Sequence, residues 1–84
     1  MNAREHFDWS VGRALEYLDA GDPVNAMSSI IMDLAHHEGT AGILTLDLHT
    51  AMIGEYLSAG AAGVRRVITG IPSPVVPATT ETPE

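Results

Sequence analysis

The residues whose types and spacing most resemble a metal site lie near the middle of the chain: Asp33, His36, His37 and Glu38. Imidazole and carboxylate groups ligate zinc, and a metal-dependent enzyme using Asp33, His36 and His37 is one hypothesis. Consecutive side chains point about 100° apart around a helix, however, so the two histidines do not face one ion. Glu38 also lacks the second histidine of an H-E-x-x-H motif. We therefore expect no metal and no cofactor, and place both histidines in the last turn of a helix, opposing its carbonyl end.

A second group of chemically distinctive side chains lies on one flank of the expected first helix. Trp9, Arg13 and Tyr17 follow one another at intervals of four residues and form a ridge, aromatic, cationic and aromatic in turn. One interpretation is intramolecular, with the arginine between two rings or the tryptophan covered by another part of the chain. The other is a protein contact, because Trp, Tyr and Arg often anchor interfaces. The sequence leaves both open.

The charge balance argues against nucleic acid as a partner. The 84 residues carry eleven acidic side chains and only four basic ones, all arginine, for a formal net charge of -7. Non-specific binding to nucleic acid depends on neutralising phosphates, which an acidic chain does not favour. An alternative function, a small DNA-associated regulator with a helix-turn-helix-like hairpin, would place Arg65 and Arg66 on phosphates. The small-residue run before these arginines lacks the spacing of the known phosphate-binding motifs.

Size and composition predict one small domain in the cytoplasm. A chain of 84 residues buries only about 60% of its unfolded surface. It has no cysteine, so no disulfide helps it fold, and this composition fits a reducing compartment. The N-terminal segment lacks the basic and apolar regions of a secretory signal. Charged side chains interrupt the apolar stretch 43–71, so we expect no membrane span.

Start and stop signals predict an antiparallel hairpin of two helices, over about 2–20 and 23–38. Asn2 is a good N-cap for the first helix. Gly21 can supply the left-handed residue that ends this helix, and Asp22 can cap the next one. A connection this short forces the two helices to run antiparallel.

A third helix is expected over about 46–69, with apolar residues on two stripes. The first stripe, expected to pack on the hairpin, contains Leu46, Ile53, Leu57, Gly60, Ala61, Val64, Ile68 and Ile71. The second stripe contains Leu48, Met52, Tyr56, Ala59 and Gly63. A helix that is apolar on two faces has more to bury than one neighbour covers. We therefore expect the second stripe to be an exposed surface for protein contacts.

The small residues 58–63 allow two structures for this helix. Gly60 can end a helix that restarts at Ala61 and runs to about Thr69. Alternatively the helix continues, and its small residues let another backbone approach, either the hairpin or the same helix in a second copy. Two glycines in a helix interior cost roughly 2 kcal/mol relative to alanine, so the second structure needs a packing gain. Because the first stripe keeps its phase through Val64 and Ile68, we favour a continuous or slightly kinked helix.

These signals together predict an all-α fold in which the hairpin packs on the long third helix. Residues 1–71 form the small helical domain. Residues 72–84 are rich in proline and threonine, and we expect them to be a disordered acidic tail.

Residues 14–34 resemble one helical hairpin of the tetratricopeptide type. The matching positions are Ala14, Tyr17, Gly21, Asp22 and Ala26. Arg13 and Asp33 depart from the motif, which has a leucine and a small residue at these places. No second copy follows, although at least three units normally make a stable array. The resemblance implies hairpin geometry and not a peptide-binding groove.

Four segments give the whole chain a resemblance to short orphan proteins of actinobacterial bacteriophages. They are A-R-E-H-F, L-D-A-G-D-P-x-N-A, H-E-G-T-A-G-I and G-x-R-R-x-I-T-G. The resemblance brings no catalytic or binding residues with it. It implies a phage protein of unknown function that acts inside a bacterial cytoplasm.

The expected function is a non-enzymatic protein-interaction module. Surplus apolar surface without a catalytic constellation predicts self-association, as a homodimer or larger oligomer, and binding of an unidentified host or phage protein. The candidate interface residues are Trp9, Arg13, Tyr17, Leu48, Met52, Tyr56, Ala59 and Gly63.

Overall fold

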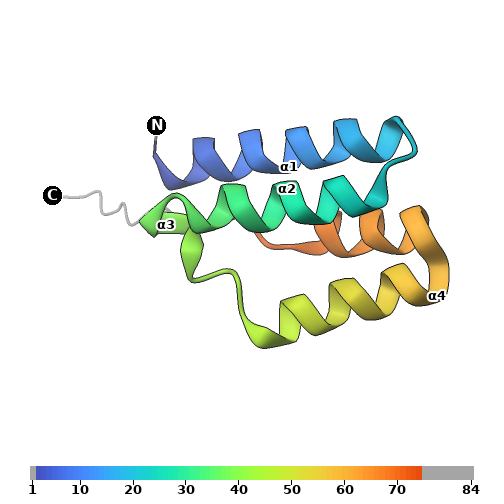
Figure 1. Cartoon of the computed structure of the whole chain (residues 1–84). Coiled ribbons are helices and arrows are strands. Elements are labelled where there is room, and N and C mark those ends of the chain that lie inside the picture. Colours follow the sequence, from blue (N-terminus) through green and yellow to red (C-terminus); the bar gives the residue numbers. More distant parts are fainter. Residues whose placement is uncertain (1, 75–84) are drawn as a thin grey trace, which may run out of the picture.

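The computed structural model describes residues 2–74, which form four helices and no strand. They are α1 (Ala3–Asp19), α2 (Pro23–Ala35), α3 (Glu38–Ala41) and α4 (Leu46–Gly70). Figure 1 shows α1 and α2 running antiparallel side by side, with α4 packed on the same pair. The predicted all-α fold, with a helical hairpin on a long further helix, is confirmed.

The hairpin forms where its sequence signals place it. The Asn2 side chain accepts from the Glu5 amide at 2.8 Å, and the Glu5 carboxylate accepts from the Asn2 amide, which completes a capping box. Gly21 takes a φ of 78°, the left-handed conformation expected after the first helix. Asp22 caps α2 by accepting from the amide of Asn25. These local signals set the hairpin geometry that the tetratricopeptide resemblance also implies.

The second helix is shorter than predicted and is followed by a single turn, α3. It ends at Ala35 instead of residue 38, because the chain turns at His36 and becomes extended at His37. His37 then caps α3, with its Nδ1 accepting from the Gly39 amide at 2.9 Å. The buried Thr40 hydroxyl donates to the carbonyl of Leu34 at 2.7 Å and fixes this turn to the end of α2. The polar side chains of His37 and Thr40 thus stabilise a corner between α2 and α3.

The long fourth helix is sharply bent at Gly60, and the prediction of a continuous or slightly kinked helix is wrong. Gly60 has φ 61° and ψ -138°, a conformation that residues with a side chain rarely adopt. We call residues 46–59 the first arm and residues 61–70 the second arm. Figure 1 shows the arms, yellow-green and orange, running in opposite directions. The alternative, in which Gly60 ends one helix and another restarts at Ala61, is the one that the structure shows.

The small residues also allow the two arms to approach closely. A Cβ atom placed on Gly63 would lie 2.3 Å from the carbonyl oxygen of Glu55, far inside any tolerable contact. The Arg66 guanidinium and the Glu55 carboxylate, 2.6 Å apart, bridge the same two arms. Both sequence interpretations of the run hold in part, since Gly60 breaks the helix and Gly63 is a crossing point. The crossing lies within one chain.

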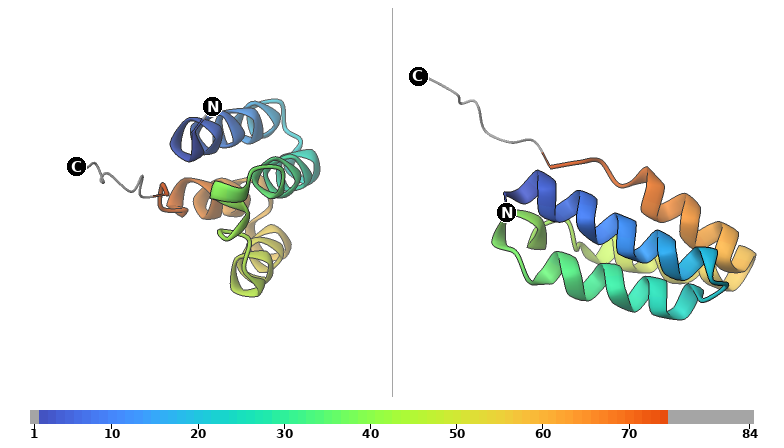
Figure 2. Two further views of the ribbon diagram at one scale, coloured as in Figure 1. Left: turned by 90° about the vertical axis from the view of Figure 1, so that its left-hand side faces the viewer. Right: turned by 90° about the horizontal axis from the view of Figure 1, so that it is seen from above.

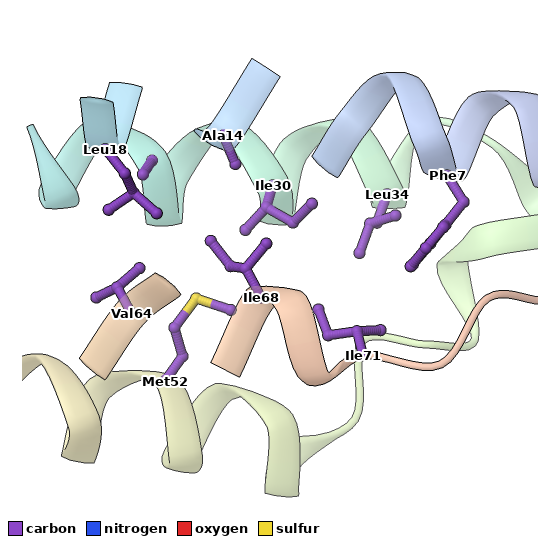
Figure 3. Close-up of a cluster of buried hydrophobic side chains, with 10 residues drawn as sticks. Phe7, Ala14, Leu18, Ile30, Leu34, Met52, Val64, Ile68 and Ile71 are labelled. Carbon is purple, nitrogen blue, oxygen red and sulfur yellow. The ribbon is translucent and has the colours of Figure 1, made fainter. Parts of the chain in front are cut away.

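The core contains apolar side chains from α1, α2 and both arms of α4. Its buried members are Phe7, Ala14, Leu18, Ala26, Ile30, Leu34, Met52, Val64, Ile68 and Ile71. Figure 3 shows Met52 reaching up from the first arm toward Val64 and Ile68, with Ile30 above them. Ile43 and Leu44 from the connecting segment pack on this cluster. The second arm thus lies at the same level as α2, with α1 on one side of the two and the first arm on the other (Figure 2).

The chain after α4 is only partly described. Ile71 is buried and residues 72–74 have no regular secondary structure. The predicted disordered tail lies outside the described residues from position 75 onward. Within residues 2–74, no helix combines the length and apolarity needed to cross a membrane.

Candidate functional site

The first arm of α4 is rotated relative to the prediction, so that its second stripe faces the core. Met52 is buried, with 1% of its surface exposed, and Leu48 and Tyr56 are half-buried against the core. The prediction that Leu48, Met52 and Tyr56 form an exposed interface stripe is therefore wrong. The reason is the bend at Gly60, because it breaks the common phase of the two arms and lets the first arm pack on the second through this stripe.

The opposite side of the first arm carries the largest exposed aliphatic side chains. Leu46 is 81% exposed, Ile53 55% and Leu57 77%, although all three were expected in the core. With the exposed Thr50 they lie at intervals of four, three and four residues, the spacing of a seam along which two helices pair. We call Leu46, Thr50, Ile53 and Leu57 the outer seam. Figure 2 shows the first arm as the outermost helix on its side of the bundle, with no other helix on its outer side.

The small residues at the bend do not extend this surface. Ala59 is exposed but lies at the turn itself, beyond the end of the outer seam. Gly63 is buried beneath the carbonyl of Glu55. Of the two small residues predicted as interface positions, Gly63 therefore serves the packing of the two arms, and neither lies on the seam.

The predicted ridge on α1 is in part intramolecular. The Arg13 guanidinium carbon lies 5.0 Å from the centre of the Trp9 ring, within the range of a cation–π contact. The same guanidinium donates from Nε to the Asp33 carboxylate at 2.8 Å. Trp9 is still 45% exposed and Tyr17 37%. The ridge thus combines a fixed arginine with two aromatic rings that keep a free surface.

Asp33 links the ridge to α2 and to the corner at α3. Besides the bond from Arg13, its carboxylate accepts from the Ser29 hydroxyl at 3.3 Å. The Asp33 carbonyl accepts a hydrogen bond from Nε2 of His6, whose ring stacks on that of His37 with centroids 5.0 Å apart. His6 was not predicted as part of this cluster. Its spacing of three residues before Trp9 is the signal that places it on the same flank of α1.

Of the two histidines predicted to oppose the carbonyl end of a helix, only His36 does so, and the prediction is wrong for His37. Nδ1 of His36 bonds to the carbonyl of Met32 at 2.6 Å, at the C-terminal end of α2. His37 accepts from an amide at the start of α3 instead, so its role is that of an N-cap. Asp33 is engaged by Arg13. Among residues 2–74, no three His, Cys, Asp or Glu side chains are grouped closely enough to hold a metal ion.

The arginines of the DNA-regulator hypothesis are bound to acidic side chains. Arg65 lies 2.6 Å from the carboxylate of Asp19, at the end of α1, and Arg66 lies 2.6 Å from that of Glu55. Carboxylates thus occupy the guanidinium groups that a phosphate backbone would need. No observation on the described part of the chain favours a nucleic-acid interface.

An apolar groove lies between the two ends of α4, far from the bend at Gly60, where the two arms separate. Its volume is about 330 Å³, and it is lined by Gly42, Ile43, Thr45, Leu48, Val67, Gly70, Ile71 and Pro72. Thr45 also caps α4 by accepting from the amide of Leu48 at 3.1 Å, so the groove adjoins the first turn of the outer seam. Leu48 faces the core, however, so the groove and the outer seam lie on opposite sides of the first arm.

Comparison of the chain with known proteins identified no relative. No family model, no curated protein and no solved structure matches the chain.

Proposed function

We propose that this chain is a non-enzymatic protein-interaction module whose main contact surface is the outer seam of α4. The exposure of Leu46, Ile53 and Leu57 along one helical stripe carries this proposal. Single exposed apolar residues are ordinary, whereas large ones aligned on one element mark a protein contact. The partner surface that fits such a seam is an apolar helix stripe.

The support beneath the seam suits a binding surface. Thr45 caps the first turn, Met52 anchors the inner side in the core, and the Glu55–Arg66 ion pair ties the far end to the second arm. The seam is therefore held in one conformation before any partner arrives. Preorganisation of this kind lowers the entropy lost on binding.

The ridge of Trp9, Arg13 and Tyr17 is proposed as a second contact surface, for an unidentified protein. It lies on α1, which Figures 1 and 2 place on the other side of the bundle from the first arm. The resemblance to short phage proteins favours a host or phage protein in a bacterial cytoplasm as this partner. Trp9→Ala should abolish its capture from a bacterial lysate, and Val24→Ala, an exposed apolar position on α2, should leave capture unchanged.

Photo-crosslinking in living bacteria tests the main surface. A photoreactive amino acid in place of Leu57 should form a covalent adduct with protein. The same amino acid in place of Val24, which is 51% exposed on α2, serves as the matched control and should form none. Equal adducts at both positions, or none at position 57, would contradict the proposal. The adduct need not be identified for this test.

A further inference from the structure

We infer that the occupant of the outer seam is the outer seam of a second copy, in an antiparallel pair related by a two-fold axis. The inference rests on the proposed function, because it names the partner of the same surface. Three observations support it: the charge of the part that carries the seam, the order of large and small residues along it, and the position of its acidic neighbour.

The seam lies on the electrically neutral part of an acidic protein. Residues 46–70 carry two carboxylates, Asp47 and Glu55, and two arginines, Arg65 and Arg66, so their formal charges cancel. Residues 2–45 carry seven acidic side chains against two arginines. Two copies therefore repel each other least when they meet through α4. A strongly basic partner would be attracted to the hairpin instead.

The order of side chains along the seam fits itself in reverse. When two seams run antiparallel about their common centre, Leu46 of one copy meets Leu57 of the other, and Thr50 meets Ile53. The two leucines at each end make apolar contacts, and the larger isoleucine faces the smaller threonine in both central layers. A parallel pair would place Thr50 against its own copy and lose a layer of apolar packing.

Asp47 also distinguishes the two directions. It is exposed in the first turn of α4, beside the seam, where it favourably opposes the positive end of the helix dipole. A parallel pair would place the two Asp47 carboxylates at the same level and align the two helix dipoles in the same direction. An antiparallel pair separates the carboxylates by most of the arm, which spans about 21 Å for its fourteen residues, and opposes the dipoles.

The size of the seam sets the strength of this pair. Stable protein interfaces bury about 800 Å² on each partner, more than one short helix stripe supplies. We therefore expect a reversible dimer with a dissociation constant of roughly micromolar order. It forms and dissociates with concentration.

Analytical ultracentrifugation of the purified full chain tests the partner. The wild-type mass should rise with concentration from the 8.9 kDa of one chain toward twice that value. Leu57→Asp should weaken association by roughly a hundredfold or more, since it removes two buried leucines and adds two charges. Val24→Asp should associate as the wild type does, and unchanged circular dichroism would show that both variants fold. A wild type that stays monomeric, or a Leu57→Asp variant that still dimerises, would overturn the inference.

Disulfide trapping tests whether the two seams run antiparallel or parallel. The sequence has no cysteine, so only the introduced cysteines can cross-link. Mixing Leu46→Cys with Leu57→Cys under mild oxidation should give a cross-linked heterodimer, while each variant alone should cross-link weakly. Efficient cross-linking of each variant alone, with little in the mixture, would show a parallel pair and overturn the antiparallel arrangement. A photo-adduct at Leu57 from a chain that stays monomeric would refute the second copy while leaving the proposed function intact.

Discussion

At the scale of single residues, the two glycines at the bend of α4 have separate roles. Gly60 supplies a positive φ that reverses the chain, and Gly63 leaves room for the carbonyl of Glu55. Neither role depends on the other, because one concerns backbone conformation and the other concerns space. Each can therefore be removed by itself.

Gly63→Ala should lower the free energy of unfolding by about 1–3 kcal/mol, because its Cβ would overlap the Glu55 backbone, which cannot swing aside. Gly12→Ala is the matched control. Gly12 lies in α1 with nothing within 4 Å of the position of its missing Cβ, so alanine there should add up to about 1 kcal/mol. Urea unfolding measures both. Equal effects of the two substitutions would show that the arms do not approach at Gly63.

Met52 and Leu57 provide a direct test of which side of the first arm faces the core. Met52→Ala should cost about 2–5 kcal/mol, as buried large-to-small substitutions do. Leu57→Ala should change stability by no more than about 0.5 kcal/mol when measured at concentrations that keep the chain monomeric. Thermal unfolding of the two variants decides. The opposite order would restore the phase expected from the sequence.

At the scale of elements, the sequence predicts where helices begin better than which side they bury. The capping residues Asn2 and Asp22 act as predicted, because a cap depends on side chains within a few residues of it. Local signals did not predict that α2 ends early, at Ala35. His37 is the N-cap of α3 and does not belong to the last turn of α2.

The phase of α4 could not be predicted because both stripes of this helix are apolar. Periodicity identifies an apolar side but does not choose between two of them, and only the bend at Gly60 decides which one is buried. The predicted interface residues were wrong for the same reason, since Met52 was expected on the surface and Leu57 in the core. The spacing of the outer seam was available in the sequence, and it is narrower than the stripe of a typical core helix.

The bend itself gives a prediction for the whole of α4. Gly60→Ala should lower the free energy of unfolding by about 1–3 kcal/mol, because alanine is strained at φ 61°. Gly54→Ala, in the interior of the first arm with open space around its Cβ position, should not be destabilising under the same conditions. Chemical unfolding of both variants provides the comparison. A Gly60→Ala protein as stable as the wild type would show that α4 does not need this turn.

At the scale of the whole molecule, the uneven distribution of charge governs how copies meet. The formal net charge of -7 lies mostly on the hairpin side, away from the neutral arms of α4. Long-range repulsion between copies thus opposes an association that the seam itself favours. Salt screens that repulsion without affecting an apolar contact to the same degree.

Raising the ionic strength should therefore strengthen self-association of the wild type. The Debye length falls from about 10 Å at 0.1 M to about 3 Å at 1 M, so most of the repulsion is lost over this range. Sedimentation equilibrium across a sodium chloride series measures the effect, with Leu57→Asp as the variant that should stay monomeric throughout. A dimer that weakens as salt is added would indicate an interface held by ion pairs and not by the outer seam.

The reversal at Gly60 brings the two ends of the described chain to one end of the bundle, which makes a circular permutation possible. Because α4 doubles back, the start of α1 and the segment that follows α4 lie at the same end of the bundle (Figures 1 and 2). A short linker between residues 74 and 2 would close the backbone into a ring, and the ring could then be cut at the exposed turn at Gly21. Such a permuted chain would keep every helix in place while exchanging local helix–helix contacts for distant ones, which should alter the folding rate more than the final structure.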